Sequence, residues 1–119
     1  MRILLLGRHQ ELNAYRIEAL EAAGFQVIAP ANRRDAVRTI LAAEYDVALL
    51  SYSLSNDTAQ EFADLVRQSC SHCPIVAISE TGWEDSKIKP DETVVGSEGP
   101  QGLIEAIQRA AAKKIRRVK

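Results

Sequence analysis

Five short apolar runs, separated by segments with helical periodicity, constrain the fold more than any other feature of the chain. The runs are mostly continuous rather than alternating, and they fall at 3–6, 26–29, 47–50, 75–78 and 93–95. Continuous apolar runs are typical of strands that are covered on both faces, as in a parallel sheet. Their alternation with helical segments predicts an α/β sheet with right-handed crossovers and helices on both faces.

Each predicted helix carries an apolar stripe at intervals of three to four residues. In the first helix the stripe is Leu12, Tyr15, Ala19 and Ala23, and Gly24 is placed to end that helix. The other stripes are Val37, Ile40 and Leu41; Ala59, Phe62, Leu65, Val66 and Ser69; and Ile104, Ile107, Ala111, Ile115 and Val118. The interval 80–92 contains Gly82 and Pro90 and predicts a single turn or an irregular loop instead of a full helix.

Length and composition place the chain among single-domain globular proteins. It has 119 residues, of which 46% are hydrophobic and 26% are charged. No apolar run approaches the roughly 18–20 residues that cross a bilayer, so we expect no membrane partner. The first residues lack the apolar core and cleavage site of a signal peptide. With two cysteines, we therefore expect a cytoplasmic protein with reduced thiols.

Charge is concentrated at the end of the chain. Residues 113–119 carry five of the fifteen basic groups and no acid, which leaves ten basic and sixteen acidic groups in residues 1–112. We expect a domain over 1–112, followed at 113–119 by a basic extension of the last helix or the start of a linker. The acidic body disfavours a nucleic-acid-binding domain, so contact with nucleic acid is expected only through the basic end or through a missing output domain.

Three segments resemble strands of the receiver domain of bacterial two-component response regulators. Residues 2–6 (RILLL) resemble the first strand of that family, 45–50 (YDVALL) the third, and 73–79 (CPIVAIS) the fourth. The resemblance spans nearly the whole chain. It implies a flavodoxin-like, doubly wound, five-stranded parallel sheet in the order 2-1-3-4-5, with the fourth helix shortened or lost. It also implies a site at the carboxyl ends of the strands.

The residues that receiver chemistry requires are mostly replaced. In the family, an aspartate closing the third strand accepts the phosphoryl group and two acids after the first strand hold Mg²⁺. A hydroxyl ends the fourth strand, and a lysine ends the fifth. The corresponding positions here are Ser51, Gly7 with Arg8, Ser79 and Gly96. Only the hydroxyl, Ser79, is retained, and a serine at position 51 needs a base to act as a nucleophile. We therefore expect a degenerate receiver with no catalytic residue, no metal and no cofactor.

Two side chains have two readings each. Arg8 either places its guanidinium in the metal pocket, with hydrogen bonds to Ser51 and Ser79, or extends into solvent. Trp83 either covers a thinned edge of the core, which is the favoured reading, or forms an exposed anchor for a protein partner.

Two local motifs look like chemistry and are not expected to perform it. Cys70 and Cys73 form a CxxC around His72, but the sequence supplies no second cysteine pair for zinc and the motif follows a helix instead of starting one. We expect ordinary thiols in a turn. The loop at 96–100 leads into the last helix, yet Glu98 disfavours an anion there, and a flexible turn is the preferred interpretation.

These observations favour a phosphorylation-independent pseudo-receiver that acts as a protein-interaction module in bacterial signalling and is not an enzyme. Its expected partners are a kinase, an output domain or a second copy in a homodimer. One alternative is a domain that senses a small anion at the Arg8, Ser51 and Ser79 end. A third and weaker alternative is an active phosphoreceiver with an unconventional acceptor.

Overall fold

A computed structural model describes residues 1–79, 88–96 and 99–117 of the chain. Trp83 and most of the segment expected to hold a shortened fourth helix lie outside these residues. The described residues form five strands and four helices. In chain order they are β1 (Arg2–Leu6), α1 (Gln10–Ala22), β2 (Gln26–Ile28), α2 (Arg33–Ala42), β3 (Val47–Ser51), α3 (Asn56–Ser69), β4 (Ile75–Ser79), β5 (Glu92–Val95) and α4 (Gly99–Arg117).

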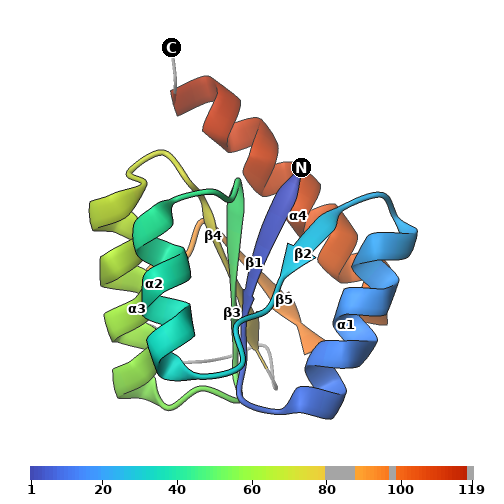
Figure 1. Ribbon diagram of the computed structural model, residues 1–119. Helices are drawn as coiled ribbons and strands as arrows, with labels where there is room; N and C mark the ends of the chain where they lie inside the picture. The colour runs from blue at the N-terminus through green and yellow to red at the C-terminus, as the bar shows by residue number, and fades with distance from the viewer. Residues whose placement is uncertain (80–87, 97–98, 118–119) are drawn as a thin grey trace.

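All neighbouring strands are parallel, and their order β2-β1-β3-β4-β5 confirms the predicted topology. The register pairs Leu6 with Leu50, Ser51 with Ile78, and Ser79 with Val95. The carboxyl ends of β1, β3, β4 and β5 therefore meet at one edge of the sheet, which is the lower edge in Figure 1.

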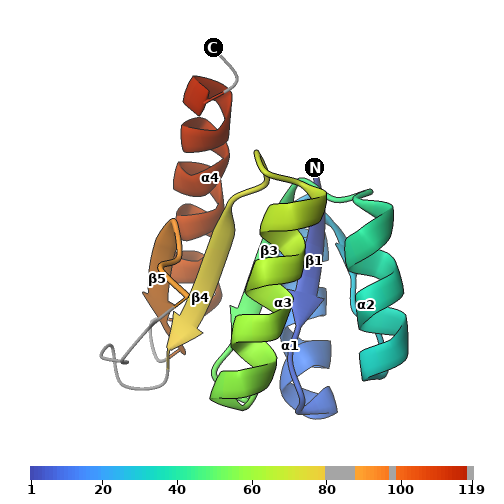
Figure 2. The same cartoon turned by 90° about the vertical axis from the view of Figure 1, so that its left-hand side faces the viewer.

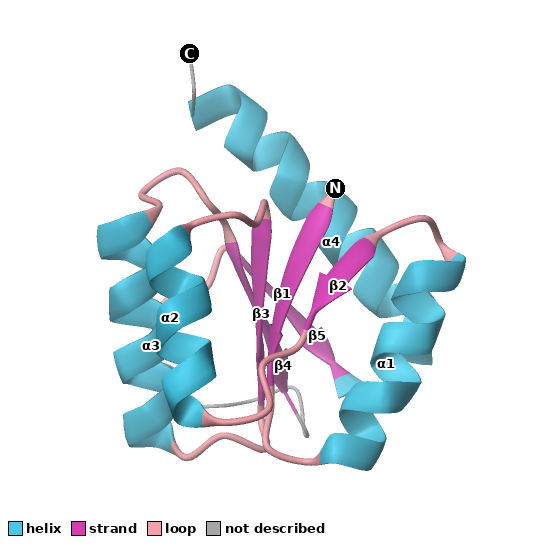
Figure 3. Cartoon of the chain, viewed as in Figure 1, coloured by secondary structure: helices cyan, strands magenta, loops and turns pink. Residues whose placement is uncertain are grey.

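The helices form one layer on each face of the sheet. Helices α2 and α3 cover one face, and α1 and α4 cover the other (Figure 1, Figure 3). The view turned by 90° shows α4 and α3 on opposite sides of β4 (Figure 2). Two apolar clusters fill the space between the layers, one containing Leu4, Ile40 and Phe62 and the other containing Leu5 and Ile107. Burial of β1, β3 and β4 on both faces explains why their sequences are continuous apolar runs.

Local capping fixes where several helices begin and end. The side chain of Asn32 accepts a hydrogen bond from the backbone N–H of Asp35 at the start of α2, and Ser55 accepts one from Thr58 at the start of α3. Gly24 follows α1 with a φ of 97°, a left-handed conformation that a glycine adopts without strain.

The predicted stripe of α1 is wrong in part. Tyr15 is 56% exposed and Ala23 is also exposed, whereas the buried residues of this helix are Asn13, Arg16 and Leu20. Two of these three side chains are polar, so hydrophobic periodicity could not reveal the buried face. Leu41, placed on the stripe of α2, is exposed as well.

The basic segment begins inside α4, which continues to Arg117. Lys113 donates to Glu92 Oε2 over 2.9 Å and to the carbonyl of Asp91, and Arg109 donates to Glu92 Oε1 over 2.5 Å. The hydrogen bond from Lys113 is the main reason that the pKa of Glu92 is lowered, with Arg109 adding to it against the effect of burial. None of the four helices in the described part of the chain combines the length and apolar character needed to cross a bilayer.

The expectation of reduced thiols is wrong for this structure, because Cys70 and Cys73 form a disulfide. The pair closes the turn between α3 and β4, where the two Cα atoms lie 5.3 Å apart, within the usual range for a bridge. Both cysteines are buried, and the imidazole of His72 lies within 4.0 Å of the sulfur of Cys70.

Candidate functional site

Four of the residues singled out from the sequence lie together at the carboxyl edge of the sheet. Ser51 ends β3 and Ser79 ends β4, and both are almost fully buried, at 3% and 1% exposed. Gly7 directly follows β1 and packs against Ser51. A Cβ atom at Gly7 would lie 3.1 Å from Ser51 Cβ. Gly96 follows β5, and a Cβ atom there would lie 3.5 Å from the carbonyl oxygen of Ser79.

A guanidinium does reach Ser51, but it belongs to Arg16. Arg16 lies on the inner side of α1 and is 6% exposed, and its Nη1 donates to Ser51 Oγ over 3.0 Å. Its Cζ atom lies 5.7 Å from the centre of the Tyr52 ring, within the range of a cation–π contact. Burial lowers the pKa of Arg16, an effect that Tyr52 partly opposes. An arginine in a protein is effectively always protonated, so the site holds a permanent positive charge.

This charge has no counter-ion in the described part of the chain. The ion pairs found there involve Arg33, Arg109 and Lys113, and none includes Arg16. Its neighbours are instead a hydroxyl and an aromatic ring.

Arg8 is exposed, so the structure favours the expectation that its side chain extends into solvent over the expectation that it fills the metal pocket. Its backbone N–H, not its guanidinium, contributes to the site by donating to Ser53 Oγ over 2.7 Å. Ser53 in turn lies 3.2 Å from Ser51 through their hydroxyl oxygens. A hydroxyl network thus connects the loop after β1 with the end of β3.

Asn13 fills the space beside Gly7. Its Nδ2 donates to the Gly7 carbonyl over 3.0 Å, and its Oδ1 is buried with no hydrogen-bond partner among the described residues. A Cβ atom at Gly7 would lie 2.6 Å from Asn13 Oδ1, which is closer than such contacts occur. The position that carries an acid in receivers therefore has no room for a side chain while Asn13 keeps its place.

The described residues at this edge do not fit a magnesium ion. Mg²⁺ requires oxygen ligands in near-octahedral geometry, and these normally include carboxylates. No carboxylate is present at Gly7, Arg8 or Ser51. The permanent charge of Arg16 also repels a cation. Among the described residues, the only convergent group of metal-ligating types is Cys70, His72 and Cys73. It lies at the opposite edge of the sheet, and its sulfurs are joined in the disulfide instead of being thiolates.

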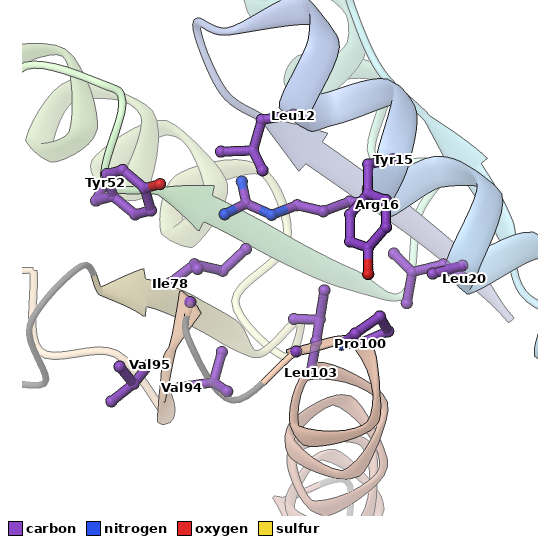
Figure 4. Close-up of a pocket in the computed structure, with 13 residues that line it drawn as sticks. Leu12, Tyr15, Arg16, Leu20, Tyr52, Ile78, Val94, Val95, Pro100 and Leu103 are labelled. Atoms are coloured by element: carbon purple, nitrogen blue, oxygen red, sulfur yellow. The ribbon is translucent and has the colours of Figure 1, made fainter.

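A small pocket opens beside the buried guanidinium, between α1, the ends of β4 and β5, and the start of α4 (Figure 4). Its volume is about 80 Å³. Arg16, Tyr15 and Tyr52 contribute polar groups to a lining that is otherwise mainly apolar. Figure 4 shows Arg16 extending from α1 toward Tyr52, past Leu12 and Ile78.

The fold described above is that of receiver domains. The chain superposes with a TM-score of 0.82 on a CheY-like receiver domain from Methanospirillum hungatei, at 15% identity, covering 98% of this chain and 97% of that one. The response regulator TrrA from Thermotoga maritima, solved with Mg²⁺ and beryllofluoride, gives 0.78 at 20% identity, with 92% and 97% covered. The chemotaxis protein CheY4 from Vibrio cholerae gives 0.76 at 21% identity, with the same coverage.

These identities support likeness in fold and not in activity. No protein-family model matches the sequence, and no curated protein matches it either. What this chain does must therefore be argued from its own residues.

Sequence reasoning missed the residues that complete the site. Asn13, Arg16, Tyr52 and Ser53 all contact its expected members. The available signal was the spacing of Asn13, Arg16 and Leu20, which places them on one face of a helix. Asn13 and Arg16 on that face indicate a buried polar contact only once the acids of receiver domains are known to be absent from the facing edge of the sheet.

Proposed function

We propose that this chain is a receiver-like signalling domain that works without phosphorylation and presents a fixed surface to a protein partner. The observation that carries the proposal is the buried hydrogen bond from Arg16 to Ser51. In a receiver the charge at this edge changes when a phosphoryl group arrives. Here a positive charge is built into α1 and is already bonded to the end of β3.

The groups around Ser51 also argue against catalysis. Its hydroxyl oxygen lies near a guanidinium and the hydroxyl and N–H of Ser53, and none of these accepts a proton as a general base would. We therefore propose a non-enzymatic role, in which Ser51, Ser79, Gly7, Arg8 and Gly96 mark a phosphorylation site that has lost its function.

The similar structures indicate the kinds of partner to be tested. TrrA has been solved in complex with the histidine kinase ThkA. NtrX from Brucella abortus contains a matching region that makes up 27% of its chain. We propose a protein partner of this kind, a kinase, an output domain or a second copy, in the bacterial cytoplasm. Nucleic acid would be contacted only through the basic end or through an attached output domain.

A two-dimensional amide NMR spectrum with and without Mg²⁺ and beryllofluoride tests the proposal. TrrA serves as the positive control, since it has been solved with both. We expect the spectrum of this chain to stay unchanged, because no carboxylate is present at Gly7, Arg8 or Ser51. Shifts clustered at 7–9, 50–53 and 78–79 would refute the proposal and support the third reading, a phosphoreceiver with an unconventional acceptor.

The second candidate function, sensing of a small anion, now depends on a different arginine. Arg8 is exposed, whereas Arg16 is buried next to both Ser51 and a pocket. The observation that favours this candidate is that Arg16 is buried and forms no ion pair with any residue that the structure describes.

A further inference from the structure

The pocket between α1 and α4 combines two properties that are typical of ligand sites. It is lined mainly by apolar side chains, and one strongly polar group is placed in its wall. That group, the guanidinium of Arg16, is more than nine-tenths buried and forms no ion pair within the described residues.

A buried cation without a counter-ion is costly, because the loss of hydration is not offset by an opposite charge. The hydrogen bond to Ser51 and the Tyr52 ring compensate it in part. A guanidinium has five N–H donors in a planar fork that suits a carboxylate. Ser51 accepts from one of these donors and Tyr52 interacts with the same guanidinium, which leaves donors for a further acceptor.

We propose that this pocket binds a small organic carboxylate with a short apolar body, whose carboxylate pairs with Arg16. The apolar body would pack against the side chains of Leu12, Ile78 and Leu103, which line the pocket. The volume of about 80 Å³ restricts the ligand to a small molecule. Such binding goes beyond the proposed interaction role and does not depend on it.

The charge of the pocket favours a monoanion over inorganic phosphate. Arg16 supplies a single positive charge, so a doubly charged phosphate would retain an unpaired charge next to apolar walls. Tyr52 and Tyr15 also line the pocket, and Figure 4 shows the hydroxyl of each. A carboxylate with two oxygens matches this small set of donors better than an anion with four.

Amide NMR titration with 2-methylpropanoate tests the proposal, with 2-methylpropanamide as an uncharged probe of the same shape. We expect saturable shifts at 12–20, 52 and 94–96 for the acid anion. The amide should bind roughly 10- to 100-fold more weakly, because it lacks the charge-assisted hydrogen bond. Inorganic phosphate should bind more weakly than the carboxylate.

Two variants and a matched control make the test specific. Arg16→Met should abolish the preference for the carboxylate over the amide, while Arg8→Met, which changes an exposed arginine at the same edge, should leave it intact. Ala19→Leu narrows the pocket without altering a charge and should weaken both probes. It keeps the test decisive if Arg16→Met does not fold.

The proposal is overturned by any of three results: no saturable binding of the carboxylate, equal binding of acid and amide, or tighter binding of phosphate. None of these results bears on the response to Mg²⁺ and beryllofluoride, so the proposed function stands or fails separately.

Discussion

Arg16 and Ser51 are 35 positions apart in the chain, yet the guanidinium of the first donates to the hydroxyl of the second inside the protein. The bond links α1 to the carboxyl end of β3, the strand that carries the phosphoacceptor in receiver domains. It places a positively charged side chain at the edge of the sheet where those domains are expected to bind a metal ion.

Replacing Arg16 by alanine is expected to lower the free energy of unfolding by about 1–3 kcal/mol. The change removes the hydrogen bond to Ser51 and the packing of the long side chain. Arg16→Met should cost less, because an apolar side chain of similar length keeps the packing and removes the buried charge. Urea denaturation measures the free energy of unfolding of the wild type and of each variant. Arg8→Ala, the exposed control, should change stability by no more than about 0.5 kcal/mol. A loss as large as that of Arg16→Ala would contradict the conclusion that Arg16, and not Arg8, is the buried arginine of the site.

Gly7→Ala tests whether Asn13 occupies the lost acidic position. The new methyl would lie 2.6 Å from Asn13 Oδ1, and we expect a loss of about 1–3 kcal/mol from overpacking. In an Asn13→Ala background the same change should cost less, with a coupling of about 1 kcal/mol in a double-mutant cycle. Equal costs in the two backgrounds would show that the two positions do not compete for space.

Tyr45 should make the protein less stable at high pH. Burial raises the pKa of its hydroxyl to about 12 from an ordinary value of 10. Between these values the unfolded chain ionises while the folded protein stays protonated, so stability falls as the pH rises through this window. The full effect is about 2 to 3 kcal/mol. Denaturation of the wild type and Tyr45→Phe at pH 9 to 12 measures it as a difference, and parallel curves for the two proteins would exclude the effect.

Reduction of the Cys70–Cys73 disulfide should leave the fold intact. The bridge closes a loop between residues only three positions apart, and the loop-entropy relation gives at most about 2 kcal/mol for so short a loop. We expect a lower midpoint in guanidinium denaturation with reductant and an unchanged amide NMR spectrum away from 70–73. Cys70→Ala/Cys73→Ala should reproduce the reduced protein and show no further response to reductant. Global unfolding on reduction would contradict this prediction.

The sheet was predictable because its three central strands, β1, β3 and β4, are buried on both faces. The runs at 47–50 and 75–78 match β3 and β4 to within one residue, and the predicted strand order is confirmed. A continuous apolar run bounded by polar residues has few other ways to be buried in a chain of this size.

The polar side of the site was only partly predictable. Ser51 and Ser79 follow from the ends of the strands, since register places them at one edge. Arg16 could not be assigned, because an arginine on a helix is usually solvated and only tertiary contacts with Ser51 and Tyr52 show that it is buried. The cysteine pair was misjudged for a related reason: spacing alone does not fix the oxidation state.

A guanidinium in place of a transferable group changes what such a domain can report. A phosphoryl group is added by one event and removed by hydrolysis, so its survival time carries information about recent history. The charge of Arg16 is made with the polypeptide and lasts until the polypeptide is degraded. Under the proposed function, the signal would therefore depend on how many copies the cell makes and on how many of them a partner holds.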